Sequence, residues 1–326
     1  MRRFGTWFVV AAVGTVALVA AADALFRGDD RSSSAVRERD GAPGEPLTGA
    51  ARLAEELREA GIRGQLVWST PGCDVRVLNL PELEEARPPE VESCAFTVSP
   101  GGQLGFDGEV SDPGGDVQAR CRGGEIEIRG RLSGLSDHID GCAPAWNREG
   151  QLTFVRDGAL MLFGFCEDTR SCEYEVVTRR DFARELAPDP WGFRSPMLEE
   201  VGWLRTNLFA AIVSDGARGN DVIGLFRGRR LLAALPNPYE DLSTLRVSPL
   251  GTYVAARVEE PSGLVLLDAT GRPLPSELRG ATAITWSPDE RWTATAAVDG
   301  VYISAAGVRA TRLFRIPLDA TDVFWR

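Results

Sequence analysis

Short stretches of alternating apolar and polar residues run through most of the chain, separated by turn residues. The segment at residues 281–296 shows the pattern most clearly: an apolar stretch ends in Trp286, a Ser-Pro-Asp sequence follows, and the alternation then resumes. Proline at the second position of a turn fixes φ, while serine and aspartate side chains bond to nearby backbone amides. The segment therefore predicts two antiparallel strands joined by a tight turn at residues 287–290.

The same pattern recurs along residues 64–326. Three units share a Gly-Gln-Leu-x-aromatic sequence, and three weaker copies follow. The six units begin at residues 64, 102, 150, 207, 251 and 290. A period of roughly 40 to 50 residues is typical of the blades of a β-propeller. The chain also ends on an apolar stretch around Trp325, where the next turn would begin, as expected of a circular array that closes on its first blade.

These repeats predict an all-β fold, a β-propeller of six blades with seven as the alternative. Each blade would be a sheet of four antiparallel strands packed against its neighbours. A short amphipathic helix is predicted ahead of the first blade at residues 49–60, since Thr48 can cap its start and Gly61 can end it. Leu53 and Leu57 give this helix a narrow apolar stripe. We expect it to pack on the propeller; a dimerisation helix is the alternative.

The N-terminus has the features of a membrane segment. Arg2 and Arg3 precede an uncharged, mostly apolar run at residues 4–22. A bilayer-spanning helix needs about 20 such residues, and the basic flank favours an N-terminus inside the cell. We therefore predict a single span near residues 6–25. A cleaved signal peptide is the alternative, because the small residues at 20–24 offer cleavage sites.

The chain divides into three predicted regions. Residues 1–26 are predicted to be a transmembrane anchor or signal peptide. Residues 27–47 hold charges, Gly, Pro and Ser with almost no large apolar side chain, which predicts a flexible linker. Residues 48–326 would form the propeller domain, outside the cytoplasm in either case: on a single-pass anchor in the cell membrane, or secreted after cleavage.

Six cysteines in an oxidising compartment predict disulfide bonds. They are Cys73, Cys94, Cys121, Cys142, Cys166 and Cys172. Cys73 and Cys94 are separated by the same number of residues as Cys121 and Cys142. A segment of this length fits within one blade, so its two ends can lie close together. The last two flank five residues between strand-like runs, as the ends of a hairpin would. We predict pairing in this order. A thiolate metal cluster is the alternative, although the chain has no Cys-x-x-Cys sequence.

Composition removes several kinds of chemistry. All 36 cationic side chains are arginine, which excludes Schiff-base chemistry and the P-loop lysine. A catalytic triad would depend on His138, the chain's one histidine, which we expect to be a solvated loop residue.

The net charge of −11 argues against nucleic acid as a partner. The neighbouring Glu199 and Glu200 should point to opposite faces of a strand, so they do not predict an acid–base couple. No catalytic, cofactor-binding or metal-binding residue is predicted.

At several positions the repeat resembles the TolB-like, WD-repeat-related β-propellers, whose blades carry a Trp-Ser-Pro-Asp-Gly turn. Residues 286–289 match four letters of this motif, with Glu290 in place of the glycine, and other units keep two or three. The matching positions are Ser99, Pro100, Trp146, Ser248, Pro249, Trp286, Ser287, Pro288, Asp289 and Trp325. The resemblance implies that these residues hold blades together. It also implies an extracytoplasmic protein that binds partner proteins or peptides at one end of the channel.

Two functional classes remain. The first is a membrane-tethered propeller that binds a protein, peptide or cell-envelope component and has no chemistry of its own. The second is a propeller enzyme, such as a lyase or lactone hydrolase, with a metal or carboxylates at the channel mouth. Carboxylates converging from several blades would favour the enzyme, whereas a mouth of aromatic and arginine side chains would favour binding.

Overall fold

Antiparallel β-sheet makes up most of the chain that the structure describes. The computed structural model describes residues 49–100, 102–130, 134–165, 171–188, 192–216, 220–235, 239–259, 263–274, 280–307 and 312–326. All of them belong to one compact unit, Leu47–Arg326. No helix within these ranges is long and apolar enough to span a bilayer. The predicted span at residues 6–25 and the predicted linker lie outside the described residues.

The strands form seven antiparallel sheets, of which five have four strands, one has five and one has two. The bounds of the strands are β1 (Gly64–Ser69), β2 (Val75–Leu80), β3 (Glu84–Ala86), β4 (Phe96–Val98), β5 (Leu104–Phe106), β6 (Val110–Ser111), β7 (Val117–Arg122), β8 (Glu125–Gly130), β9 (Ser136–Asp140), β10 (Cys142–Trp146), β11 (Leu152–Arg156), β12 (Ala159–Phe165), β13 (Ser171–Val177), β14 (Pro196–Arg205), β15 (Leu208–Asp215), β16 (Asn220–Arg227), β17 (Arg230–Ala234), β18 (Tyr239–Glu240), β19 (Leu242–Val247), β20 (Tyr253–Val258), β21 (Gly263–Asp268), β22 (Pro273–Leu274), β23 (Ala283–Trp286), β24 (Trp292–Ala297), β25 (Gly300–Ala305), β26 (Phe314–Ile316) and β27 (Asp322–Trp325).

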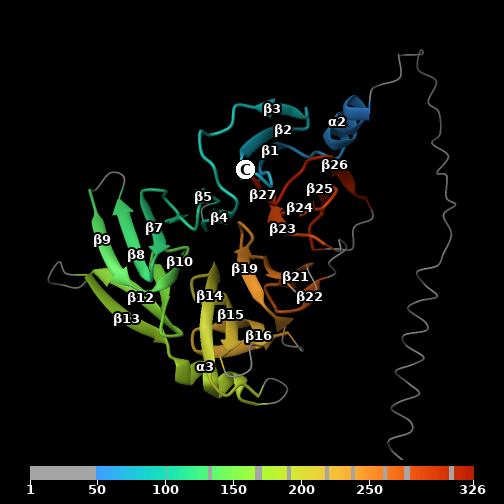
Figure 1. Ribbon diagram of the computed structural model, residues 1–326. Helices are drawn as coiled ribbons and strands as arrows, with labels where there is room; N and C mark the ends of the chain where they lie inside the picture. The colour runs from blue at the N-terminus through green and yellow to red at the C-terminus, as the bar shows by residue number, and fades with distance from the viewer. Residues whose placement is uncertain are drawn as a thin grey trace, which may run out of the picture. The chain divides into compact units, whose positions relative to one another are not determined.

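The sheets follow one another around a common centre, as in a β-propeller (Figure 1). Their strand orders are β27-β1-β2-β3, β4-β5, β6-β7-β8-β9, β10-β11-β12-β13, β14-β15-β16-β17 with β18 on β16, β19-β20-β21-β22 and β23-β24-β25-β26. In most sheets, therefore, the first strand in the chain lies innermost and the last lies at the outer edge. Apolar side chains of neighbouring sheets share cores, such as the one joining Leu204 and Ile212 to Leu245 and Val254.

The ring closes through its two ends, as the sequence predicted. β27 pairs with β1, with Leu66 opposite Trp325, so the last described strand becomes the inner strand of the first sheet. The backbones of Gln65 and Arg326 exchange two hydrogen bonds, with N···O distances of 2.7 and 3.0 Å. The Trp325 indole N–H also donates to the Arg63 carbonyl over 3.0 Å. Closure of this kind covers the inner edge of β1, which would otherwise be unpaired.

The Ser-Pro turns share a local mechanism that ties each inner strand to the next strand. Ser287 accepts a hydrogen bond from the Trp292 backbone N–H at 3.0 Å. Ser248 accepts from the Tyr253 N–H at 2.9 Å. In the turn after β10 an asparagine takes this role, because Asn147 Oδ1 accepts from the Gln151 N–H at 2.9 Å. Arg148 in the turn after β10 donates to the Pro249 carbonyl at 2.6 Å, and the Leu250 N–H donates to Glu290 in the turn after β23. These turns therefore lie together at one end of the propeller, which we call the turn end.

The number of sheets differs from the main prediction. Seven sheets fit a seven-bladed ring, the alternative to the predicted six, with the sheet of β4 and β5 reduced to two strands. The prediction of six blades was wrong because it counted residues 102–150 as one unit. That stretch contains β5 and also the whole β6–β9 sheet, whose turn between β6 and β7 has no Gly-Gln-Leu sequence.

Two helices accompany the sheets. Helix α2 (Gly49–Glu59) ends near Gly61, which has φ of 73°, and it buries Leu57 against the core of the first and last sheets. This agrees with the prediction that the helix packs on the propeller. Helix α3 (Arg179–Leu186) lies between β13 and β14, and Thr178 with Asp181 forms its capping box.

Two of the three predicted disulfides are present. Cys73 is bonded to Cys94, and Cys121 to Cys142. The first ties the start of β2 to the segment before β4, and the second ties β7 to β10. The third predicted pair includes Cys166, which lies outside the described residues, so that pair stays a prediction.

Candidate functional site

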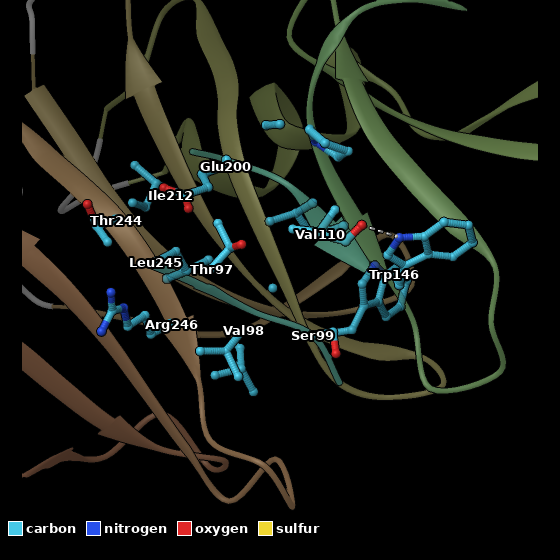
Figure 2. Close-up of a pocket in the computed structure, with 18 of the residues that line it drawn as sticks. Thr97, Val98, Ser99, Val110, Trp146, Glu200, Ile212, Thr244, Leu245 and Arg246 are labelled. Atoms are coloured by element: carbon cyan, nitrogen blue, oxygen red, sulfur yellow. Dashed lines mark hydrogen bonds between the residues drawn. The ribbon is translucent and has the colours of Figure 1, made fainter. Parts of the chain in front are cut away.

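A cavity of about 450 Å³ lies among the inner strands of the propeller (Figure 2). Its walls come from β4, β10, β14 and β19, with additions from β6, β7 and β15. Apolar groups such as Val98, Ile212 and Leu245 alternate with the hydroxyls of Thr97 and Thr244 on these walls. The volume falls within the range of roughly 300–1,000 Å³ found for ligand pockets.

Three inner strands that line the cavity each contain a β-bulge. The pairing register shifts within β10 between Cys142 and Ala145, and within β19 between Ser243 and Arg246. It also shifts within β14, between Leu198 and Glu200.

Two residues of these bulges take left-handed backbone conformations. Ala143 has φ of 48° and Thr244 has φ of 52°. For residues other than glycine this conformation is uncommon and carries strain. The bulges also redirect backbone and side-chain groups toward the channel.

Glu200, on β14, is the carboxyl group inside the cavity. The Leu245 backbone N–H, freed by the bulge at Thr244, donates to this carboxylate, and the charge of Arg246 favours its ionised form. Enclosure by protein outweighs both effects and raises the pKa of Glu200 to about 7. The carboxyl group therefore changes charge close to neutral pH. No ion pair to Glu200 is found within the described ranges.

Arg246, on β19, crosses the channel and joins three other inner strands. Its guanidinium donates to the carbonyls of Ile284 at 3.1 Å, Val323 at 3.0 Å and Phe96 at 3.1 Å, and it pairs with Asp322. Asp322 in turn accepts from the Phe96 N–H at 2.7 Å.

This charged cluster is almost completely buried. The side chains of Arg246 and Asp322 are only 6% and 7% exposed. Arg246 lines the cavity, but its Nε–H is buried and has no hydrogen-bond partner among the described residues. The cluster therefore leaves one buried donor unsatisfied.

Acidic side chains gather at the rim opposite the turn end. Burial raises the pKa of Asp221, and the nearby carboxylates of Glu199 and Asp241 raise it further, against a hydrogen bond from the Leu242 N–H. Glu259 accepts from the Ser243 hydroxyl at 3.0 Å. We call Glu199, Asp221, Asp241 and Glu259 the acidic rim. Within the described part of the rim, Arg257 is the cation that pairs with one of them, Glu259, at 3.2 Å.

The two glutamates of the predicted pair have different surroundings. Glu199 is exposed and accepts from the Ser214 hydroxyl at 2.6 Å, whereas protein encloses Glu200, and the expectation that they point to opposite faces stays a prediction. Arg246 and Asp322 were not singled out, since neither belongs to a motif. His138, expected in a loop, lies exposed on β9, the edge strand of its sheet.

The motif residues lie mainly at the turn end and in the cores between sheets. Trp286 and Trp325 are buried in such cores, and Trp146 is buried with its indole N–H donating to the Val110 carbonyl at 3.2 Å. Hydrogen bonding to Ser287 is the largest cause that lowers the pKa of Asp289 in the same turn. Glu290 takes φ of 53°, the left-handed conformation that Gly251 supplies in the preceding unit.

No group of three or more His, Cys, Asp or Glu residues is arranged to hold a metal ion in the described part of the chain.

No family model matches the chain, and no curated protein matches it. Among solved structures the chain is similar to the β-propeller domain of Cps50 (Swd1) from Myceliophteria thermophila. The sequences are 12% identical, the match covers 77% of this chain and 86% of that chain, and the TM-score is 0.43. A likeness this distant carries no argument about ligands or partners. The assignment as a β-propeller rests on the sheet order and ring closure described above.

Proposed function

We propose that the chain is a membrane-tethered, extracytoplasmic β-propeller that binds a protein, peptide or cell-envelope component at the acidic-rim end. The observation that carries this proposal is the central cavity with three consecutive bulged strands in its wall. Backbone strain persists only where the surrounding fold maintains it, and it clusters at functional sites. Loops and strand ends on a rigid ring are also well suited to recognition.

The chemistry of the cavity supports binding. Its walls are a mixture of apolar groups and hydroxyls, and Glu199, Glu200 and Arg246 are the charged groups among its described lining residues. The charge of Arg246 is already balanced by Asp322. A few polar groups that orient a ligand, set among apolar side chains, are the usual composition of a ligand-binding pocket.

A propeller enzyme of the lyase or lactone-hydrolase type is the second candidate. The observation that favours it is the pKa of Glu200, about 7, because a general acid or base works best with a pKa near the operating pH. Turnover of a lactone or an acidic polysaccharide by the wild-type protein, lost in Glu200→Gln, would establish this candidate in place of binding.

The extracytoplasmic location is supported by the two disulfides and by the uncharged N-terminal run. Disulfides persist in oxidising compartments and are rare in the cytosol. Protease added to intact cells should therefore digest residues 48–326. Protection of this region until the membrane is broken would contradict the proposed orientation.

Site-specific crosslinking tests which end of the propeller binds. A photoreactive amino acid at Ser243, beside the acidic rim, is compared with one at Leu250, which is 56% exposed at the turn end. We expect a discrete crosslinked partner from position 243 in cells that make the full-length protein, and none from position 250. Crosslinks from position 250 alone, or from neither position, would contradict the proposal.

A further inference from the structure

The cavity and the acidic rim together define the chemistry of a ligand. The rim carboxylates lie at the ends of β14, β16, β19 and β20 that are opposite the Ser-Pro turns. The electrostatic effect of Glu199 and Asp241 on the pKa of Asp221 places these three carboxylates close together. Among the described residues of this entrance, four carboxylates with one arginine give a negative potential, which attracts cationic groups.

Inside the entrance, the enclosed carboxyl group of Glu200 has no ion pair among the described residues. Arg246, the nearby cation, is committed to Asp322 and to three backbone carbonyls. A negatively charged ligand would therefore meet a guanidinium that is already neutralised, and it would have to pass the acidic rim. A cationic ligand would supply Glu200 with its missing counter-ion.

The cavity walls suit a long side chain with a charged end. Val98, Val110, Ile212 and Leu245 provide apolar surface around the path to Glu200 (Figure 2). Lysine and arginine bury their methylene stems against such surface while their charged ends bond elsewhere. The hydroxyls of Thr97 and Thr244 on the same walls can hydrogen-bond to the main chain of the inserted segment.

We infer that the cavity receives a lysine or arginine side chain from a partner protein, whose charged end pairs with Glu200 while the acidic rim draws it in. This inference rests on the proposed binding function and specifies the class of its ligand. It assigns Glu200 as the specificity-determining residue. Arg246 holds the inner strands together around the cavity.

Ionisation of Glu200 should couple binding to pH. The charged groups that face it are Arg246 on β19, with Asp322 behind it on β27, and Glu199 on its own strand. The parts of β4 and β10 that line the cavity contribute no ionised side chain. With a pKa of about 7, the ionised fraction of Glu200 rises from about a tenth at pH 6 to about nine-tenths at pH 8. A ligand that binds only the ionised form should gain about tenfold in affinity over that range.

The test uses the full-length protein in detergent and four pentapeptides with blocked ends, Gly-Ala-X-Ala-Gly, in which X is lysine, arginine, norleucine or glutamate. Binding is followed by the fluorescence of the protein's tryptophans, since Trp146 and Trp203 line the cavity. We expect the lysine and arginine peptides to bind, about tenfold more tightly at pH 8 than at pH 6. The norleucine and glutamate peptides should bind at least tenfold more weakly.

Two variants make the test specific. Glu200→Gln should lose both the preference for cationic peptides and the pH dependence, while the exposed Glu149→Gln at the turn end should keep both. Equal binding of the lysine and norleucine peptides, an unchanged preference in Glu200→Gln, or no peptide binding at millimolar concentration would overturn the inference. If crosslinking at Ser243 still captures a partner while any of these results is obtained, the binding function stands and the inferred ligand class is wrong.

Discussion

Replacement of Arg246 by methionine should destabilise the propeller more than any single loss of a surface ion pair. The change keeps an apolar side chain of similar length but leaves Asp322 buried without its cation, since both side chains are less than 10% exposed. It also removes the donors to the carbonyls of Phe96, Ile284 and Val323. Breaking a buried ion pair by removing one partner typically costs about 3–5 kcal/mol. The three lost hydrogen bonds place our expectation in the upper half of that range.

The assay is urea unfolding of the full-length protein, followed by tryptophan fluorescence. A loss of stability should appear as a lower midpoint at an unchanged slope. Arg129→Met is the matched control: Arg129 pairs with Glu127 at 3.0 Å, but its side chain is 68% exposed. Exposed pairs contribute about 0–1 kcal/mol, so the control should shift the midpoint little.

A double-mutant cycle separates the ion pair from general packing effects. Asp322→Leu should also be strongly destabilising, because it leaves the Arg246 guanidinium buried without its counter-ion. The double variant Arg246→Met/Asp322→Leu should lose clearly less than the two single losses added together, by about 2 kcal/mol or more. Losses that simply add, or a loss of less than about 1 kcal/mol in Arg246→Met, would refute the view that this pair joins the inner strands.

Three further predictions concern the cavity, a turn and the disulfides. Since burial raises the pKa of Glu200 to about 7, ionising it in the folded protein costs on the order of 3 kcal/mol. This cost is absent below the ordinary pKa of about 4.5 and complete above pH 7. The stability of the wild-type protein relative to Glu200→Gln should therefore fall from about pH 5 to 8. A difference in urea midpoints that stays constant over this range would contradict the prediction. Gly251→Ala would place a methyl group 2.1 Å from a backbone oxygen at φ of 73°, whereas Gly150→Ala at φ of 79° meets nothing within 4 Å. We expect a loss of about 1–2 kcal/mol for the Gly150 variant and several more for the Gly251 variant, and equal thermal midpoints would disagree with the structure. Peptide mapping without reductant should recover both described disulfides, and reduction of each should cost about 3 kcal/mol; free thiols at these four cysteines would contradict this.

The sequence was sufficient for the propeller and its closure because their signals are local. Each turn is formed by Ser, Pro, Asn or Gly within four or five residues. A single stretch such as residues 287–292 therefore contains both the donor and the acceptor of the hydrogen bond that closes the turn. The repeated spacing indicated the propeller but undercounted its sheets by one, because the turn between β6 and β7 has a different sequence. Equal separations between cysteines likewise pointed to the two disulfides that the structure contains.

The cavity could not be predicted because its residues meet only through the closed ring. Arg246 and Asp322 are 76 residues apart, and Arg246 reaches Phe96 across 150 residues. The bulges could not be predicted from the sequence either. Their left-handed positions are occupied by Ala143 and Thr244, whereas glycine at these positions would have indicated a left-handed conformation. Glu200 was noticed, but the sequence could not show that the closed ring encloses its carboxyl group.

The pairing of β27 with β1 makes the order of synthesis matter for folding. β1 emerges from the ribosome early, whereas the strand that completes its sheet follows every other described strand, with Leu66 and Trp325 at the two ends of the propeller. Until then the inner edge of β1 is unpaired, and an unpaired edge is a template for association with other chains. Association of the nascent propeller through this edge should therefore stop only when β27 has paired with β1.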